Sequence, residues 1–246
     1  MKSLRKYVVC LWIIFVTAQA PYALAGWKDL LEDVKGAVGL SGELSDSTII
    51  QGLKEALQIG TGNAVKLVSQ MDGYYKNPDI KILLPDTVKK VEKALRLVGY
   101  GPQVDAFELS MNRAAEQAVP KAKELFWDSI KQMTVVDAKK ILNGKENEAT
   151  LYFENKTRDR LMETFRPIVH TSMSQVGVTR SYQALEEKVR KAPFIKDLVS
   201  VDLDQYVTDR ALNGLFLMLA EEERKIRTDP AARVTKLLKD VFGKKN

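Results

Sequence analysis

The chain has 246 residues, a single cysteine and a single histidine, and a formal net charge of +6 at pH 7. One cysteine cannot form an internal disulfide, and one histidine with one cysteine excludes zinc sites built from several nitrogen and sulfur ligands. The charge falls to +3 once the three basic residues at the N-terminus are set aside, so the composition gives no strong electrostatic case for nucleic acid as a partner.

The N-terminus has the pattern of a secretory signal peptide. Basic residues lie in Met1–Lys6, an apolar run follows over Tyr7–Ala18, and Ala23-Leu24-Ala25 places small residues where a signal peptidase reads them. We expect cleavage after Ala25, so that the mature chain begins at Gly26. A cut after Ala20 would place Pro21 directly behind it, which fits an extended protease-bound strand poorly.

The same segment argues against a membrane anchor. Its apolar run is shorter than the roughly 20 residues of a spanning helix. Cys10 lies in the middle of that run rather than beside the cut, so lipid attachment is not expected. We therefore expect residues 1–25 to be removed, 26–43 to form a lead-in helix or linker, 44–243 to form a helical domain, and the protein to be soluble in the periplasm.

The first helix of that domain is predicted over Ser45–Met71. Apolar residues recur there at steps of three and four, at Ile50, Leu53, Leu57, Ala64, Leu67 and Met71. Gly60 and Gly62 interrupt the pattern and predict either a kink or a close crossing by another helix. Gly60-Thr61-Gly62 has no third glycine and no preceding strand, so it is a poor candidate for a nucleotide loop.

An extended segment follows the first helix. Ile80, Ile82 and Leu84 alternate with Lys81 and Leu83, after the turn signals Asp72-Gly73 and Asn77-Pro78 and before Pro85. Because no second strand is indicated nearby, this pattern predicts a strap that lies across helices rather than a sheet.

Helical spacing then returns and continues along the chain. Helices are predicted from Val88 to Gly99, from Val104 to Pro120, from Ala122 to Met133, and from a capping box of Thr134 and Asp137 through Leu142. A short helix over Ala149–Asn155 is expected to precede a longer one over Thr157–Val176, with a kink near Glu163 caused by Pro167. A charged helix beyond Gly177 and a linker over Ala192–Val201 complete this part.

The C-terminal part centres on one very apolar helix. Asp202 is predicted to cap it, and its middle, Gly214–Ala220, is apolar on every side and must therefore be surrounded. We expect its end to be exposed, with Glu221 paired to Lys225 and Glu223 to Arg227. A last helix begins at Asp229-Pro230 and ends at Gly243.

Several segments together resemble a known family. They are Ile50–Leu57, Asn77–Ile82 with Leu84-Pro85, Asn112–Glu116, Met133-Thr134 with Asp137-Ala138, Tyr152-Phe153 with Lys156-Thr157, and Asp229–Arg233. In this order they are similar to the bacterial domain-of-unknown-function family four-one-nine-seven, from about Leu44 to Phe242. The resemblance implies an exported helical envelope protein of a Gram-negative bacterium, and it transfers no catalytic residues.

Catalytic chemistry has little support in the sequence. His170 lacks a recognisable nucleophile and orienting partner, and Asp202 with Asp204 lacks the rest of a calcium loop. Carboxylates that could serve a glycan hydrolase are Glu108, Glu116 and Glu163. Asn112, Arg113 and Glu116 form a candidate polar cluster, for which an ion-pair or helix-contact role is the simpler interpretation.

Aromatic and basic residues supply one further candidate site. Tyr74, Tyr75 and Tyr152, with Lys156 and Arg158, could form a surface for a ligand or a partner, although tyrosines also suit the rim of a core.

The sequence thus predicts a single irregular, all-α multi-helix domain around an apolar C-terminal helix, with one short extended strap. We expect no cofactor, no metal and no nucleic acid. The predicted function is a non-enzymatic envelope protein that binds a hydrophobic ligand or another envelope protein. The alternative is a peptidoglycan-directed hydrolase that uses a glutamate.

Overall fold

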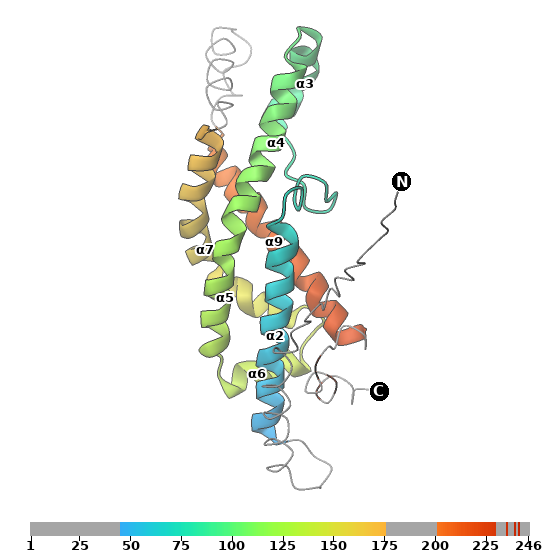
Figure 1. The fold of residues 1–246 in the computed structure, drawn as a ribbon, viewed down its shortest axis with the longest axis vertical. Coiled ribbons are helices and arrows are strands. Elements are labelled where there is room, and N and C mark those ends of the chain that lie inside the picture. The colour runs from blue at the N-terminus through green and yellow to red at the C-terminus, as the bar shows by residue number, and fades with distance from the viewer. Residues whose placement is uncertain (1–44, 176–200, 230–234, 236–238, 240, 242–246) are drawn as a thin grey trace, which may run out of the picture. The chain divides into compact units, whose positions relative to one another are not determined.

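The computed structural model describes residues 45–175, 201–229, 235, 239 and 241, and every regular element within them is helical, as predicted (Figure 1). The elements are α2 (Asp46–Val68), α3 (Asp86–Leu97), α4 (Gly101–Ala118), the 3-10 helix η1 (Val119–Lys121), α5 (Ala122–Lys131), α6 (Val135–Asn143), α7 (Glu148–Gln175) and α9 (Leu203–Thr228). Four predicted features lie outside the described residues: the signal peptide 1–25, the lead-in 26–43, the charged helix and linker over 177–200, and most of the last helix. Over the described ranges, none of the helices combines the length and the apolar character that crossing a membrane requires.

Side-chain caps begin several of these helices where the sequence predicts them. Thr134 and Asp137 form the capping box at the start of α6. The Asp202 carboxylate accepts a hydrogen bond from the backbone N–H of Gln205 at 2.9 Å and so caps α9. α3 ends where Gly99 takes a positive φ of 91°, and the N–H of Tyr100 turns back to the carbonyl of Leu95.

The core is built around α9, which packs against α2, α4 and α7. Its buried Phe216 contacts Phe126 of α5, whose ring in turn lies 5.1 Å from that of Phe153 on α7. The prediction of a surrounded helix is therefore confirmed for most of its middle. Leu217 departs from it because its side chain is 44% exposed.

The region predicted as two helices, Ala149–Asn155 and Thr157–Val176, is one continuous helix, α7. Thr157 is buried, and its hydroxyl donates to the carbonyl of Phe153 in the same helix at 2.7 Å. The polar residues Asn155 and Lys156 are exposed on the outer side of that helix and do not interrupt it. Pro167 lies inside α7.

The end of α9 is also different from its prediction. Glu223 is buried, and its carboxylate accepts hydrogen bonds from the backbone N–H groups of Ala149 (3.0 Å) and Thr150 (2.8 Å) at the start of α7. Arg227 pairs with Glu223 at 2.8 Å, as predicted, whereas Lys225 pairs with Glu222 rather than with Glu221. The predicted exposure of this end holds for Arg224, Lys225 and Thr228 but is wrong for Glu223, because spacing along α9 cannot show that the N-terminus of α7 lies beside it.

Two glycines mark close helix contacts. A Cβ at Gly60 would lie 3.3 Å from the Ile226 side chain, which confirms the predicted close crossing by another helix, while one at Gly62 would meet nothing within 4 Å. In α9, a Cβ at Gly214 would lie 2.7 Å from the ring of Tyr74 and 3.0 Å from the side chain of Ile80.

Replacing Gly214 by alanine should therefore destabilise the protein by about 1–3 kcal/mol, because the added methyl group overpacks a rigid part of the core. Gly62→Ala is the matched control, and it should be neutral or stabilising by about 0.5–1 kcal/mol since the site is open and helical. Urea unfolding of both variants measures the difference. Equal free energies of unfolding would contradict the close contact at Gly214.

Candidate functional site: the clamped connection between α2 and α3

The connection between α2 and α3, residues Ser69–Pro85, contains the predicted strap Ile80–Leu84. Ile80, Ile82 and Leu84 are buried, whereas Leu83 between them is 47% exposed. No strand occurs in the described part of the chain, and residues 81–85 lie outside every helix, so the segment does not form a sheet, as predicted.

Asn112 of α4 holds the middle of the strap. Its side-chain oxygen accepts a hydrogen bond from the N–H of Ile82 at 2.8 Å, and its amide nitrogen donates to the carbonyl of Ile82 at 2.9 Å. On the other side, the Tyr206 hydroxyl of α9 donates to the carbonyl of Leu83 at 3.0 Å. The strap is thus fixed between α4 and α9.

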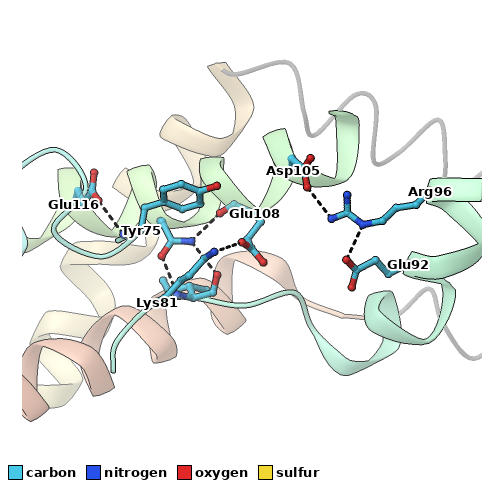
Figure 2. Close-up of polar contacts among 9 residues, drawn as sticks. Tyr75, Lys81, Glu92, Arg96, Asp105, Glu108 and Glu116 are labelled. Atoms are coloured by element: carbon cyan, nitrogen blue, oxygen red, sulfur yellow. Dashed lines mark hydrogen bonds and ion pairs between the residues drawn. The ribbon is translucent and has the colours of Figure 1, made fainter. Parts of the chain in front are cut away.

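Glu116 holds the earlier part of the connection. Its carboxylate is buried and accepts hydrogen bonds from the backbone N–H groups of Tyr74 (3.1 Å) and Tyr75 (3.4 Å). Figure 2 shows the hydrogen bond from the N–H of Tyr75. The second oxygen of the carboxylate accepts from Arg113 at 2.6 Å. Two backbone donors and a guanidinium satisfy this carboxylate, so its role is to position the connection.

Asp72 supplies a third anchor. It is a non-glycine residue with a positive φ of 68°, and its carboxylate pairs with Lys76 at 2.7 Å and with Arg113 at 2.5 Å. The hydrogen bonds from Lys76 and Arg113 lower the pKa of Asp72 below its ordinary value. Asparagine and aspartate tolerate this backbone conformation better than other side chains, which explains an aspartate here.

Tyr74 lies in the core rather than on the surface. Its side chain is fully buried, and its hydroxyl donates to the carbonyl of Ala211 in α9 at 2.6 Å. Burial, together with the charge of Glu116, raises the pKa of the phenol far above its ordinary value of 10.0. Of the two adjacent tyrosines, only Tyr75 is therefore placed to meet a partner.

Tyr75 is partly exposed and lies beside two cations. The Lys81 ammonium is 4.5 Å from the centre of its ring, and the Arg113 guanidinium is 6.0 Å from it. Lys81 also pairs with Glu108 at 2.5 Å, and its hydrogen bond to Glu108 raises the pKa of the ammonium (Figure 2). The ring, the cations and the carboxylate form one compact surface on the α4 side.

Charged side chains also make contacts near the start of α4, where α3 packs against it. Arg96 of α3 pairs with Glu92 at 2.9 Å and with Asp105 of α4 at 2.7 Å (Figure 2). Its hydrogen bond lowers the pKa of Asp105. These contacts join α3 to α4 at the surface, where single ion pairs contribute little to stability.

The remaining candidates from the sequence lie elsewhere. The Tyr152 hydroxyl donates to the carbonyl of Ser129 in α5 at 2.9 Å, and burial raises its pKa. Lys156 is exposed on α7, and Arg158 bridges Glu154 to α9. The structure therefore joins Tyr75 to the cluster of Asn112, Arg113 and Glu116, but it does not join Tyr152, Lys156 and Arg158 to it.

No candidate carboxylate is arranged as a catalytic pair. Glu116 is fully engaged, Glu108 pairs with Lys81, and Glu163 is exposed on α7. His170 lies on the surface, with its Nδ1 2.7 Å from the Asp204 carboxylate. A search of the described ranges finds no group of three or more histidine, cysteine or acidic residues that could hold a metal ion.

A small cavity lies between α2, α6, α7 and α9. Its walls include the apolar side chains of Leu57, Ile141 and Phe153, with Glu223 and Arg227 at one side. The cavity volume is about 20 Å³, which is room for about one water molecule. An acyl chain or a drug-sized molecule would need a far larger space.

We call the residues that hold the α2–α3 connection in place, Asp72, Tyr74, Asn112, Glu116 and Tyr206, the clamp. Several features of the clamp and its surroundings are not evident from sequence alone. Asp72 was visible only as turn chemistry, and Lys81 only as a polar position in an alternating segment. Gly214 appears in the sequence only as the first residue of a very apolar stretch, although a glycine inside such a helix could have indicated a close approach. Asn112 and Glu116 stood out as polar residues beside an alanine stripe, but their partners lie 30 and about 40 positions away in the chain.

Replacing Asn112 by alanine should cost about 2–4 kcal/mol of unfolding free energy, because it leaves the buried N–H and carbonyl of Ile82 without partners. Asn155→Ala, at an exposed position of α7, is the control and should change stability by less than about 0.5 kcal/mol. Chemical denaturation followed by far-UV circular dichroism measures both. A cost at Asn112 as small as that at Asn155 would show that the strap does not depend on this side chain.

Tyr74 predicts a loss of stability in alkali. Above pH 10.0 the phenol ionises in the unfolded chain but stays neutral in the fold, so the unfolded state binds fewer protons and stability falls as pH rises. The contribution is about 1.4 kcal/mol for each pH unit. Tyr74→Phe should be less stable near neutrality, because the buried hydrogen bond from the hydroxyl to the Ala211 carbonyl is lost, yet show a shallower decline in alkali. Parallel declines in urea unfolding experiments would refute this.

Comparison with known proteins extends the resemblance found in the sequence. No curated protein and no solved structure matches the chain. One family model matches residues 43–243, which include the clamp, α9 and all of the described helices. The chain therefore belongs to the family described as "Protein of unknown function (DUF4197)".

Proposed function

We propose that this chain is an exported, non-enzymatic protein of the cell envelope, and that it binds another envelope protein through the surface around the α2–α3 connection. We call that surface the connection face and assign to it Tyr75 with its neighbouring cations Lys81 and Arg113, and the exposed apolar residues Met71 and Leu83 of the same connection. The observation that carries the proposal is a backbone segment clamped from both sides that nevertheless presents an apolar side chain, Met71, to solvent with 82% of it exposed.

The clamp favours recognition because a fixed surface loses little conformational entropy when a partner binds. Asn112, Glu116 and Tyr206 hold the backbone of the connection, so little backbone entropy remains to be lost there when a partner binds. Met, Tyr and Arg are enriched in the centres of protein–protein interfaces. Met71, Tyr75 and Arg113 supply one of each.

A protein partner is better supported than an internal hydrophobic ligand. The cavity between α2, α6, α7 and α9 has room for about one water molecule, so an apolar ligand in it would have to displace core side chains. The connection face needs no such rearrangement. Export rests on the basic, apolar and small-residue regions of residues 1–25, which form a complete signal pattern.

The proposal is tested by placing a photo-crosslinking amino acid at Met71 in cells that make the protein. We expect an adduct with one defined envelope protein, identified by mass spectrometry, and loss of that adduct when Tyr75 is also replaced by alanine. The intact mass of the same purified protein should be that of a chain that begins at Gly26.

The control position is Val136, which is 76% exposed at the start of α6. A crosslinker there should not capture the same protein. Absence of an adduct at Met71, or an identical pattern from both positions, would overturn the role of the connection face. A mass that includes residues 1–25 would overturn export.

A further inference from the structure

The turn between α3 and α4 has an unusual composition for an exposed turn. The turn and the helix ends that flank it, Leu97–Pro102, are leucine, valine, glycine, tyrosine, glycine and proline, without one charged side chain. Leu97 is 87% exposed and Val98 is 68% exposed. Exposed turns normally carry Asn, Asp or Ser, whose side chains interact with water and with the local backbone.

The turn is held in shape, so the exposure of these side chains is part of the fold. Gly99 adopts a positive φ of 91°, and the N–H of Tyr100 bonds to the carbonyl of Leu95 at 2.9 Å. Tyr100 is partly buried against the core. Leu97 and Val98 are therefore held outward while the residues on either side are anchored.

The α3–α4 turn lies at the opposite end of α4 from the junction of that helix with α5. α3 packs on α4, and α4 runs for 18 residues from the turn to Ala118 (Figure 1). At 1.5 Å per residue this is about 27 Å. Leu97 and Val98 are neighbours in the chain and both are exposed where the two helices are joined. A peptide ligand needs a groove or a pocket, whereas exposed apolar side chains can enter a soft apolar medium directly.

Basic side chains lead to this turn along α3. Lys89, Lys93 and Leu97 recur every four residues and so lie on one side of the helix. The Lys89 ammonium lies 3.4 Å from the Asp86 carboxylate, and the positive charge of Arg96 is balanced by two carboxylates. Lys93 is exposed, and no ion pair is found for it in the described part of the chain. An uncompensated cation thus lies one turn from the exposed leucine.

We propose that the α3–α4 turn docks on an anionic lipid surface, with Leu97 and Val98 entering the boundary between headgroups and acyl chains and Lys93 facing the phosphates. Shallow insertion of apolar side chains flanked by cations is how peripheral proteins bind membranes. Each lysine near such a surface adds electrostatic attraction to anionic lipids. The site is separate from the connection face and does not depend on it.

The test is co-sedimentation of the full purified chain with vesicles of phosphatidylcholine, with and without phosphatidylglycerol. We expect the partition coefficient of the double variant Leu97→Ser, Val98→Ser onto the vesicles to be at least about tenfold lower than that of the parent protein. Lys93→Glu should weaken binding to the anionic vesicles by roughly fivefold for each unit of charge and leave binding to neutral vesicles unchanged.

The matched control is Val135→Ser, Val136→Ser, which removes two exposed apolar side chains at the start of α6. Any contribution from the rest of the chain, including residues 1–25, is the same in all variants and cancels. Equal partitioning of the turn variant and this control would overturn the docking site. A Lys93→Glu variant that binds anionic vesicles like the parent, or a parent that binds neither vesicle, would overturn it as well.

Discussion

Two hydrogen bonds between the Asn112 side chain and the backbone of Ile82 replace the neighbouring strand that the strap lacks. An extended segment has backbone N–H and C=O groups that a helix would satisfy internally, and leaving them buried without partners is costly. Asparagine carries one acceptor and two donors on a short side chain, so a single residue of α4 can serve both groups. Its second donor bonds to the carbonyl of Glu108 within α4.

The rest of the clamp depends on this arrangement. With Ile82 fixed, Ile80 and Tyr74 reach α9, where only a glycine at position 214 leaves room for them. The Tyr74 hydroxyl then satisfies the Ala211 carbonyl, and Glu116 satisfies the N–H groups that begin the connection. Packing and hydrogen bonding therefore reinforce each other, and a change in one contact is expected to affect the others.

Features set by local chemistry could be predicted from the sequence. The alternation at Ile80, Ile82 and Leu84 predicts the strap, and Thr134 and Asp202 predict their caps, because each signal involves residues within a few positions of one another. Gly60 likewise predicts a close crossing, although not that Ile226 is the contact.

Features set by distant parts of the chain could not be predicted in the same way. Glu223 has the four-residue spacing of a surface pair with Arg227, yet its carboxylate caps α7 some 73 positions away. Asn112 and Glu116 could be identified as a polar cluster, but not as supports for the backbone of the strap. Tyr74 and Tyr75 are adjacent and chemically alike, and only the fold separates a core residue from a surface one.

The function proposed for the connection face uses the surface that this clamp presents, and it requires the connection to be rigid. Hydrogen exchange at the Ile82 amide tests that rigidity most directly, because this N–H has a side chain rather than a helix as its partner. We expect this amide to exchange as slowly as amides in the core of α9, through global unfolding. Exchange at the rate of an unstructured peptide, with α9 still protected, would contradict it.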